Sequence, residues 1–308
     1  MNIEKLTITS REKWLEWRKQ DYTASNIGAL FNCHPYTTPL RMYAEKRGTE
    51  FVLEDNNAMR RGRWMEPAVA KAVEEVRPEW KLEPAKDYLR CPELKIGATP
   101  DFYIHGDPRG KGILQAKTVA PSVYAREWAG GDEVPLWIIL QATTEAMLAN
   151  ADFIVVAALL VDAHNMDVSI HEMPRSSAAE DKIKRAVETF WQNVQLGIEP
   201  DPDFVRDADT IKAIWKSEKD KDAEVDLSGN NTIPLLLEQR ALLKETIKTS
   251  EGRLEAIDAE LKHAMKDAAV ATGIDGWRIT YRTNHVKGYT VAARDQRVLR
   301  VTDQRGKG

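Results

Sequence analysis

Apolar and polar positions follow helical spacing over several long segments of the chain. In residues 57–76 and 177–196 the apolar residues return every three or four positions, which is typical of amphipathic helices with one buried face. Gly197 directly follows the second segment and marks its end. The predicted helices are Ser10–Lys19, a helix that starts at Ser25 with Thr23 or Ser25 near its N-cap, Leu40–Lys46, Asn57–Val76, Pro135–Asn150, Ser177–Leu196 and Asp207–Lys216.

Strand patterns lie between these helices. Asp152–Leu160 is a continuous apolar run of the kind that is buried on both faces of a sheet, and Asp167–Met173 alternates and is expected to pair with it. Val119–Pro135 is rich in glycine and charge and is predicted as a loop. The other predicted strands are Trp80–Arg90 and the two arms of a hairpin, Thr99–His105 and Gly112–Thr118, which a turn at Gly106–Lys111 joins. Helices and strands together predict an α/β protein.

The pattern changes after the sequence Pro200-Asp201-Pro202, so we divide the chain into residues 1–200, 201–231 and 232–308. Residues 217–231 have the composition of a linker. Pro234–Ala271 is predicted as one long helix that either pairs with a copy of itself or folds back on the core. Trp277–Tyr281 and Tyr289–Ala292 then suggest a β-hairpin. The apolar heptad positions of the long helix include Leu236, Leu243, Ile247, Leu254, Ile257 and Leu261, with interruptions at Arg240 and Ser250.

Composition indicates an ordinary cytoplasmic protein. The chain is 43% hydrophobic and 30% charged, with a net charge of −4, so there is no basic excess to indicate phosphate contacts. The longest apolar run, Phe153–Val161, has the length of a strand, and the N-terminus lacks the apolar stretch of a signal peptide. We therefore expect no membrane association. Cys33 and Cys91 fit a reducing compartment and are too few to hold a four-cysteine iron–sulfur cluster.

The predicted hairpin carries the residues with the clearest chemistry. Asp101 lies on its first strand, while Gln115 and Lys117 are two residues apart on the second and therefore point to the same face. Oxygen ligands on such a hairpin can hold Mg²⁺, and the ammonium group can stabilise charge that develops on a phosphate. The pattern is what a metal-dependent phosphodiester hydrolase needs.

Four short motifs in this order resemble a known family. Pro100-Asp101 and Gln115-x-Lys117 resemble the PD-(D/E)xK nuclease signature. The preceding Gly97-Ala98-Thr99 and the segment Gly62-Arg63-Trp64-Met65-Glu66-Pro67 narrow the resemblance to the YqaJ-type phage recombination exonucleases, a lambda-exonuclease-like group, over roughly residues 10–200. The resemblance implies a PD-(D/E)xK nuclease core, a central mixed sheet flanked by helices, in residues 1–200. The long helix and the small hairpin would form an appendage.

The resemblance also implies roles for individual residues. Mg²⁺ or Mn²⁺ would be held by Glu66, Asp101, Gln115 and the carbonyl oxygen of Ala116. Lys117, Gln115 and Gln141 would act at the scissile phosphate. Arg18, Thr23 and Ser25 would bind the 5′-phosphate of DNA. From the residues alone, a capping hydroxyl and a surface arginine are the favoured explanation of the last group, and Glu66 could be a first-turn helix acid before Pro67.

Gln115 departs from the family pattern, which usually has Glu or Asp at this position. An amide oxygen can ligate Mg²⁺ but brings no charge, so Glu66 and Asp101 alone would supply the negative charge. Similarly, the family often has two glutamines two residues apart on the helix that contains Gln141, whereas the second position here is Thr143.

The resemblance implies a Mg²⁺-dependent exonuclease that degrades one strand of linear duplex DNA in the 5′-to-3′ direction. Its 3′ overhangs would serve a phage single-strand annealing protein, and the chain would form a homo-oligomer, a trimer by resemblance, in the bacterial host cell. Two alternatives remain open: a sequence-specific endonuclease or nickase on the same fold, and a DNA-end-binding protein with a weakened site.

Overall fold

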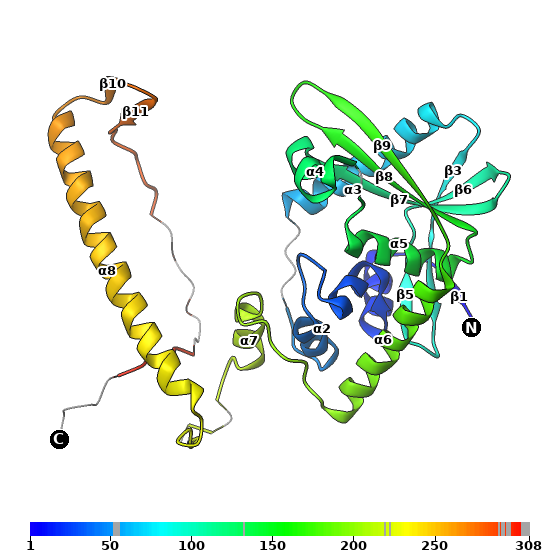
Figure 1. Ribbon diagram of the computed structural model, residues 1–308, viewed down its shortest axis with the longest axis horizontal. Helices are drawn as coiled ribbons and strands as arrows, with labels where there is room; N and C mark the ends of the chain where they lie inside the picture. The colour runs from blue at the N-terminus through cyan, green and yellow to red at the C-terminus, as the bar shows by residue number, and fades with distance from the viewer. Residues whose placement is uncertain are drawn as a thin grey trace. The chain divides into compact units, whose positions relative to one another are not determined.

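The computed structural model describes residues 1–51, 56–131, 133–218, 220, 221, 223–288, 290, 293 and 297–302. The chain divides into two compact units, Met1–Trp215 and Lys216–Gly308 (Figure 1). No helix in these described ranges is both long enough and apolar enough to cross a membrane.

Unit 1 is built on a five-stranded mixed sheet. Its strands lie in the order β3 (Lys81–Pro84), β6 (Phe102–Asp107), β7 (Gly110–Val119), β8 (Phe153–Val161) and β9 (Met166–Pro174). All neighbours are antiparallel except β7 and β8. A parallel pair needs a long crossover, and the chain supplies it with α4 (Pro121–Glu127), the 3₁₀ helix η2 (Ala129–Gly131) and α5 (Leu136–Ala149).

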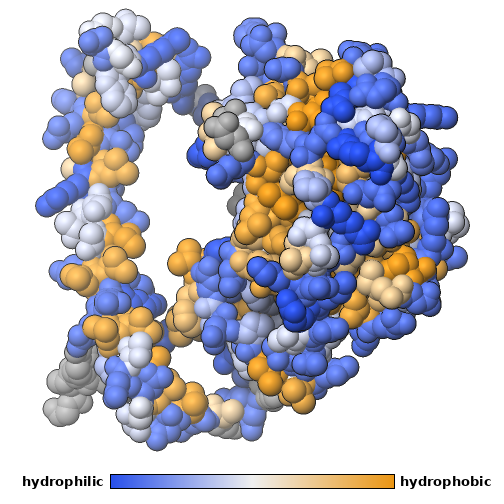
Figure 2. All heavy atoms as spheres, turned by 45° about the vertical axis from the view of Figure 1, so that its right-hand side comes forward, coloured by the Kyte–Doolittle hydropathy of each residue, from blue (hydrophilic) through white to orange (hydrophobic). Residues whose placement is uncertain are grey.

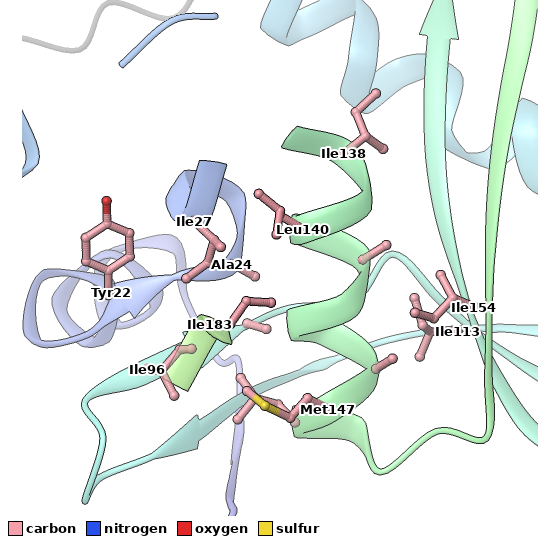
Figure 3. Packing of buried hydrophobic residues seen from close by; sticks show 14 of the residues in the cluster. Tyr22, Ala24, Ile27, Ile96, Ile113, Ile138, Leu140, Met147, Ile154 and Ile183 are labelled. Atoms are coloured by element: carbon pink, nitrogen blue, oxygen red, sulfur yellow. The ribbon is translucent and has the colours of Figure 1, made fainter. Parts of the chain in front are cut away.

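Helices cover both faces of this sheet. Leu114, Val155 and Ala157 pack with α3 (Asn57–Val76) on one face. Ile113 and Ile154 on the other face pack with α5, as Figure 3 shows. Because β8 is covered on both sides, it needs apolar residues at successive positions, which explains its sequence. The expected α/β class, with a central mixed sheet between helices, is confirmed.

A second, four-stranded sheet packs beyond α5. Its order is β1 (Glu4–Thr7), β4 (Asp87–Cys91), β5 (Ile96–Ala98) and β2 (Tyr22–Thr23). The helices on this side are α1 (Arg11–Gln20), the 3₁₀ helix η1 (Ala24–Phe31), α2 (Pro39–Lys46) and α6 (Ser177–Leu196). Tyr22, Ile27, Ile96 and Ile183 meet α5 in one core, so α5 lies between the two sheets (Figure 3).

Several predicted elements agree with the structure. Helices Asn57–Val76 and Ser177–Leu196 are confirmed to the residue. The predicted hairpin exists, but its strands are Phe102–Asp107 and Gly110–Val119, so Asp101 lies just before the first strand rather than on it. Pro100 precedes Asp101 and cannot donate a ladder hydrogen bond, which favours a strand start after this point.

Three predictions for unit 1 are wrong in detail. Trp80–Arg90 is not one strand: the chain leaves the first sheet after Pro84 and enters the second at Asp87. The helix expected from Ser25 is the 3₁₀ helix η1, and its N-cap Thr23 makes no capping hydrogen bond from its side chain. The expected loop Val119–Pro135 contains α4, which starts at Pro121, a residue suited to a first helical turn.

Unit 1 continues past residue 200 to Trp215. The short helix α7 (Ala208–Ile214) packs against α2, and the Thr38 hydroxyl donates to the carboxylate of Asp207 at its N-cap. Arg206 donates to the carbonyl oxygens of His34 and Thr37. These contacts attach α7 to the N-terminal part of the chain.

Unit 2 consists of the helix α8 (Thr232–Met265) and a small hairpin. The helix ends before the predicted Ala271, because residues 270–274 form β10 (Val270–Ile274), which pairs with β11 (Trp277–Thr280). The predicted pairing of Trp277–Tyr281 with Tyr289–Ala292 is therefore wrong, because the strand Trp277–Thr280 pairs with β10 instead. Most of Tyr289–Ala292 lies outside the described residues. Apolar side chains such as Leu243, Leu254 and Ile257 are exposed along α8, as Figure 2 shows for this helix.

Gly97 is a position where the second sheet has no room for a side chain. A Cβ atom there would lie 1.9 Å from the hydroxyl oxygen of Tyr88, which is buried and donates to Asp21 over 3.1 Å. We expect Gly97→Ala to lower the free energy of unfolding of unit 1 by about 2 kcal/mol, because Tyr88 must leave its position. Chemical denaturation measures the change. Gly62→Ala, in open space on α3, should instead leave stability equal or higher, and equal effects of the two changes would contradict this packing.

Candidate active site

The candidate site lies where the hairpin strands have unequal length. β6 starts at Phe102, opposite Leu114, whereas β7 continues to Val119 and keeps β8 as its partner on the other side. The end of β7 therefore has one edge without a strand neighbour among the described residues of unit 1. We call this place the notch. A cavity of about 300 Å³ opens there, and it is lined by Gly62, Glu66, Val69, Asp101, Gln115, Ala116, Lys117, Thr118 and Gln141.

Asp101 fills the position that a strand residue would have occupied beside Ala116. Its Oδ2 accepts from the backbone N–H of Ala116 over 2.8 Å and from Nε2 of Gln115 over 2.5 Å. Since the N–H and C=O of a strand residue point to the same edge, the Ala116 carbonyl oxygen also points into the notch. Glu66 reaches the same cavity from α3, on the opposite side of the strand.

Lys117 is held by the helix α5. Its Nζ donates to Oε1 of Gln141 over 3.3 Å and lies 5.3 Å from the ring centre of Trp137. The other end of the Gln141 amide donates from Nε2 to Oε1 of Glu145 over 2.9 Å. Gln115 and Lys117 thus point to the same face of β7, as their spacing predicts, and this face is the one that α5 covers. The ammonium lies at the wall of the cavity.

The positive charge near Glu66 and Asp101 is too small to offset the burial of their carboxylates. Burial, and then repulsion by Asp101, raise the pKa of Glu66 to about 7, against the opposing effect of Lys117. Burial also raises the pKa of Asp101, while the charge of Lys117 and the two hydrogen bonds lower it. Two acids whose ionised forms are both disfavoured form a site that a cation would stabilise.

The oxygen atoms of the notch fit a hard divalent cation. Glu66 and Asp101 supply carboxylates and Ala116 a carbonyl group, and Oε1 of Gln115 is buried without a hydrogen-bond partner. Oxygen ligands of this kind suit Mg²⁺ or Mn²⁺. Within the described residues there is no cluster of three or more His, Cys, Asp or Glu side chains able to hold a metal, so any cation here depends on two carboxylates and neutral oxygens.

Arg18, Thr23 and Ser25 form a second polar cluster. Nη2 of Arg18 donates to the Ser25 hydroxyl over 3.0 Å, and the hydroxyl oxygens of Thr23 and Ser25 are 3.2 Å apart. Burial lowers the pKa of Arg18, whose guanidinium also lies 4.4 Å from the ring centre of Trp14. Because η1, which carries Ser25, packs on α5, this cluster and the notch lie on neighbouring elements.

Two further polar side chains lie close to the site, His34 and Glu145. Both ring nitrogens of His34 are engaged by the backbone: Nδ1 accepts from Tyr36 and Thr37, and Nε2 lies 3.0 Å from the Ser25 carbonyl oxygen. Glu145 was missed. It is 1% exposed, and its one signal in the sequence is a lone acid in an otherwise apolar helix, one turn after Gln141.

The raised pKa of Glu66 predicts how the stability of the metal-free protein depends on pH. Folded Glu66 binds a proton up to about pH 7, whereas the unfolded chain releases it near the ordinary value of 4.5. The free energy of unfolding should therefore decrease as pH rises from about 4.5 to 7. Glu66→Gln should make this decrease smaller. Chemical denaturation in the presence of a chelator, at a series of pH values, checks the change; equal slopes for the two proteins would contradict it.

The fold can be compared with solved structures. An alkaline exonuclease from Laribacter hongkongensis is 17% identical and matches with a TM-score of 0.49 over 65% of this chain and 99% of that chain. A phage-related exonuclease from Haemophilus somnus 129PT is 14% identical, with a TM-score of 0.43 over 58% of this chain and 95% of that one.

Sequence comparison gives a closer relation. The protein YqaJ of Bacillus subtilis strain 168 is 27% identical over 269 residues, which cover 86% of this chain and 82% of that protein. The matched family model spans the residues that carry the notch and the Arg18 cluster, from α1 to the end of α5. Residues 13–152 match the model of the YqaJ-like viral recombinase domain.

Proposed function

We propose that the protein is a metal-dependent exonuclease that degrades one strand of linear duplex DNA from its 5′ end and leaves a 3′ overhang. The convergence of Glu66, Asp101 and Lys117 on one cavity carries this proposal. Paired acids beside an ammonium group suit phosphodiester hydrolysis, and the similarity to a viral recombinase domain favours DNA as the substrate.

Glu66, Asp101, Gln115 and the Ala116 carbonyl would hold Mg²⁺ or Mn²⁺ in the notch. When bound, such a cation polarises a phosphoryl oxygen and lowers the pKa of a water molecule. Lys117 lies at the cavity wall with its ammonium directed to Gln141, where it can stabilise negative charge on the scissile phosphate. Gln141 keeps the ammonium in place and can orient the attacking water or the phosphate. Gln115 supports Asp101 through its amide nitrogen.

The Arg18 cluster would bind the 5′-phosphate of the DNA end. A largely buried guanidinium next to two hydroxyl groups offers several hydrogen-bond donors to a phosphate. Recognition of a 5′-phosphate on the element next to the notch would fix which end of the strand enters. This cluster is the basis for the proposed 5′-to-3′ direction.

The wider role is proposed from the same family relation. A 3′ overhang is the substrate of a single-strand annealing protein, which we propose as a partner in phage-type recombination. A ring-shaped homo-oligomer, a trimer, would keep the enzyme on its DNA. An endonuclease or nickase would cut closed circular DNA, and an end-binding protein would bind DNA without releasing nucleotides.

Removal of either main charged group should abolish cleavage. We expect Asp101→Ala and Lys117→Ala to lower the rate of nucleotide release by at least about a hundredfold, since the first removes a carboxylate that would hold the cation and the second removes the positive charge beside the scissile phosphate. The assay uses Mg²⁺ and linear duplex DNA labelled at the 5′ or the 3′ end, beside a closed circle. Lys111→Ala is the matched control: Lys111 lies on the same strand but donates to the Ala149 carbonyl, away from the notch. Unchanged digestion by Lys117→Ala, or cleavage of the circle, would refute the proposal.

The Arg18 cluster predicts a preference for phosphorylated ends. Wild-type protein should digest 5′-phosphorylated duplex faster than 5′-hydroxyl duplex, and Arg18→Gln should remove most of this difference while leaving digestion of the hydroxyl end nearly unchanged. Initial rates on the two substrates check this. An equal preference in Arg18→Gln and wild type would exclude Arg18 as the phosphate ligand.

A further inference from the structure

Glu145 is an acidic residue in the buried core, where acidic side chains are rare. It is 1% exposed on α5, and its neighbours on the helix, Ala142 and Ala146, are fully buried. Burial of a carboxyl group costs free energy unless hydrogen bonds replace its water. Glu145 receives one such bond, from Gln141, and its Oε2 has no hydrogen-bond partner among the described residues. The fold therefore keeps Glu145 at a cost in stability.

The hydrogen bond between Gln141 and Glu145 determines the orientation of the Gln141 side-chain amide. An amide side chain has a donor end and an acceptor end, and the two can exchange by rotation. Glu145 Oε1 accepts from Nε2 of Gln141, which leaves Oε1 of Gln141 as the end that faces the Lys117 ammonium. This holds whether the carboxyl is ionised or protonated, because Oε1 accepts in both states. With the amide reversed, its N–H groups would face the ammonium and repel it.

The charges of both polar clusters act on Glu145. Burial raises the pKa of Glu145, and the charge of Asp101 raises it further, while Lys117 and Arg18 act in the opposite direction. The carboxyl group is therefore close enough to both clusters for each to influence it. No other described residue is recorded as bonding the Nε2 end of Gln141.

We propose that Glu145 is a positioning residue, which orients the Gln141 amide so that its carbonyl oxygen holds the Lys117 ammonium at the notch. The consequence for catalysis rests on the proposed nuclease function, whereas the effect on Lys117 does not. Loss of a residue that orients a site ligand from behind typically costs about 10- to 100-fold in activity.

Two substitutions separate this role from a purely structural one. Glu145→Leu removes the acceptor, so kcat for duplex DNA with Mg²⁺ should fall about 10- to 100-fold, with a smaller change in KM. Its melting temperature should change little, because removal of an incompletely bonded buried carboxyl offsets the loss of the acceptor for the Gln141 amide. Glu145→Gln keeps an oxygen that can accept from Gln141 and should retain activity within about threefold of wild type.

Glu180→Leu is the matched control. Glu180 is also a buried glutamate, but it pairs with Arg175, which precedes α6 and also donates to Asn150 and Ala151 after the end of α5, so its loss should lower the melting temperature and leave kcat unchanged. A fall in kcat for Glu180→Leu equal to that of Glu145→Leu would show that any buried acid has this effect, and would overturn the proposal.

Lysine side-chain NMR of the metal-free, full-length protein provides a readout independent of cleavage. The signal of Lys117, assigned with Lys117→Arg, should shift in Glu145→Leu and stay near its wild-type position in Glu145→Gln. If wild-type protein cleaves no DNA but the signal shifts, the nuclease proposal fails and the positioning role stands. An unshifted Lys117 signal in Glu145→Leu would overturn the positioning role. An equal loss of kcat in Glu145→Leu and Glu145→Gln would overturn it as well.

Discussion

The late start of β6 at Phe102, opposite Leu114, beside a β7 that continues to Val119 is the constraint on which the site depends. A fully paired β7 would have no free edge for a ligand. Because the last part of β7 pairs only with β8, the Ala116 backbone turns to Asp101, and Gln115 and Lys117 are held in an extended strand beside an open cavity. β8, buried on both faces, keeps that edge in place.

Charge arrangement follows from this geometry. Glu66 and Asp101 come from opposite sides of the strand end and repel one another, while Lys117 is drawn back towards α5. A divalent cation would relieve this repulsion, since it adds positive charge between the two carboxylates. The neutral Gln115 fits the same arrangement, because its amide donates to Asp101, which a carboxylate could not do.

The residues that were predictable from sequence share a local signal. Asp101, Gln115 and Lys117 could be placed together because a hairpin fixes which residues face one another, and α3 and α6 because their apolar periods are long. The break after Pro84 was not predictable, since strands Lys81–Pro84 and Asp87–Cys91 join different sheets and only tertiary pairing decides this. Glu145 was missed because its importance depends on the rotation of α5 against the sheet, which no local pattern encodes.

The parallel pairing of β7 and β8 also has a consequence for biosynthesis. A nascent chain that has grown only through α5 already contains the β6–β7 hairpin, but the partner of the outer edge of β7 has yet to be translated. Until Phe153–Val161 leaves the ribosome, that edge presents unpaired backbone groups flanked by apolar side chains. Translation is therefore a stage at which this edge of β7 could pair with another chain, and at which a chaperone could protect it.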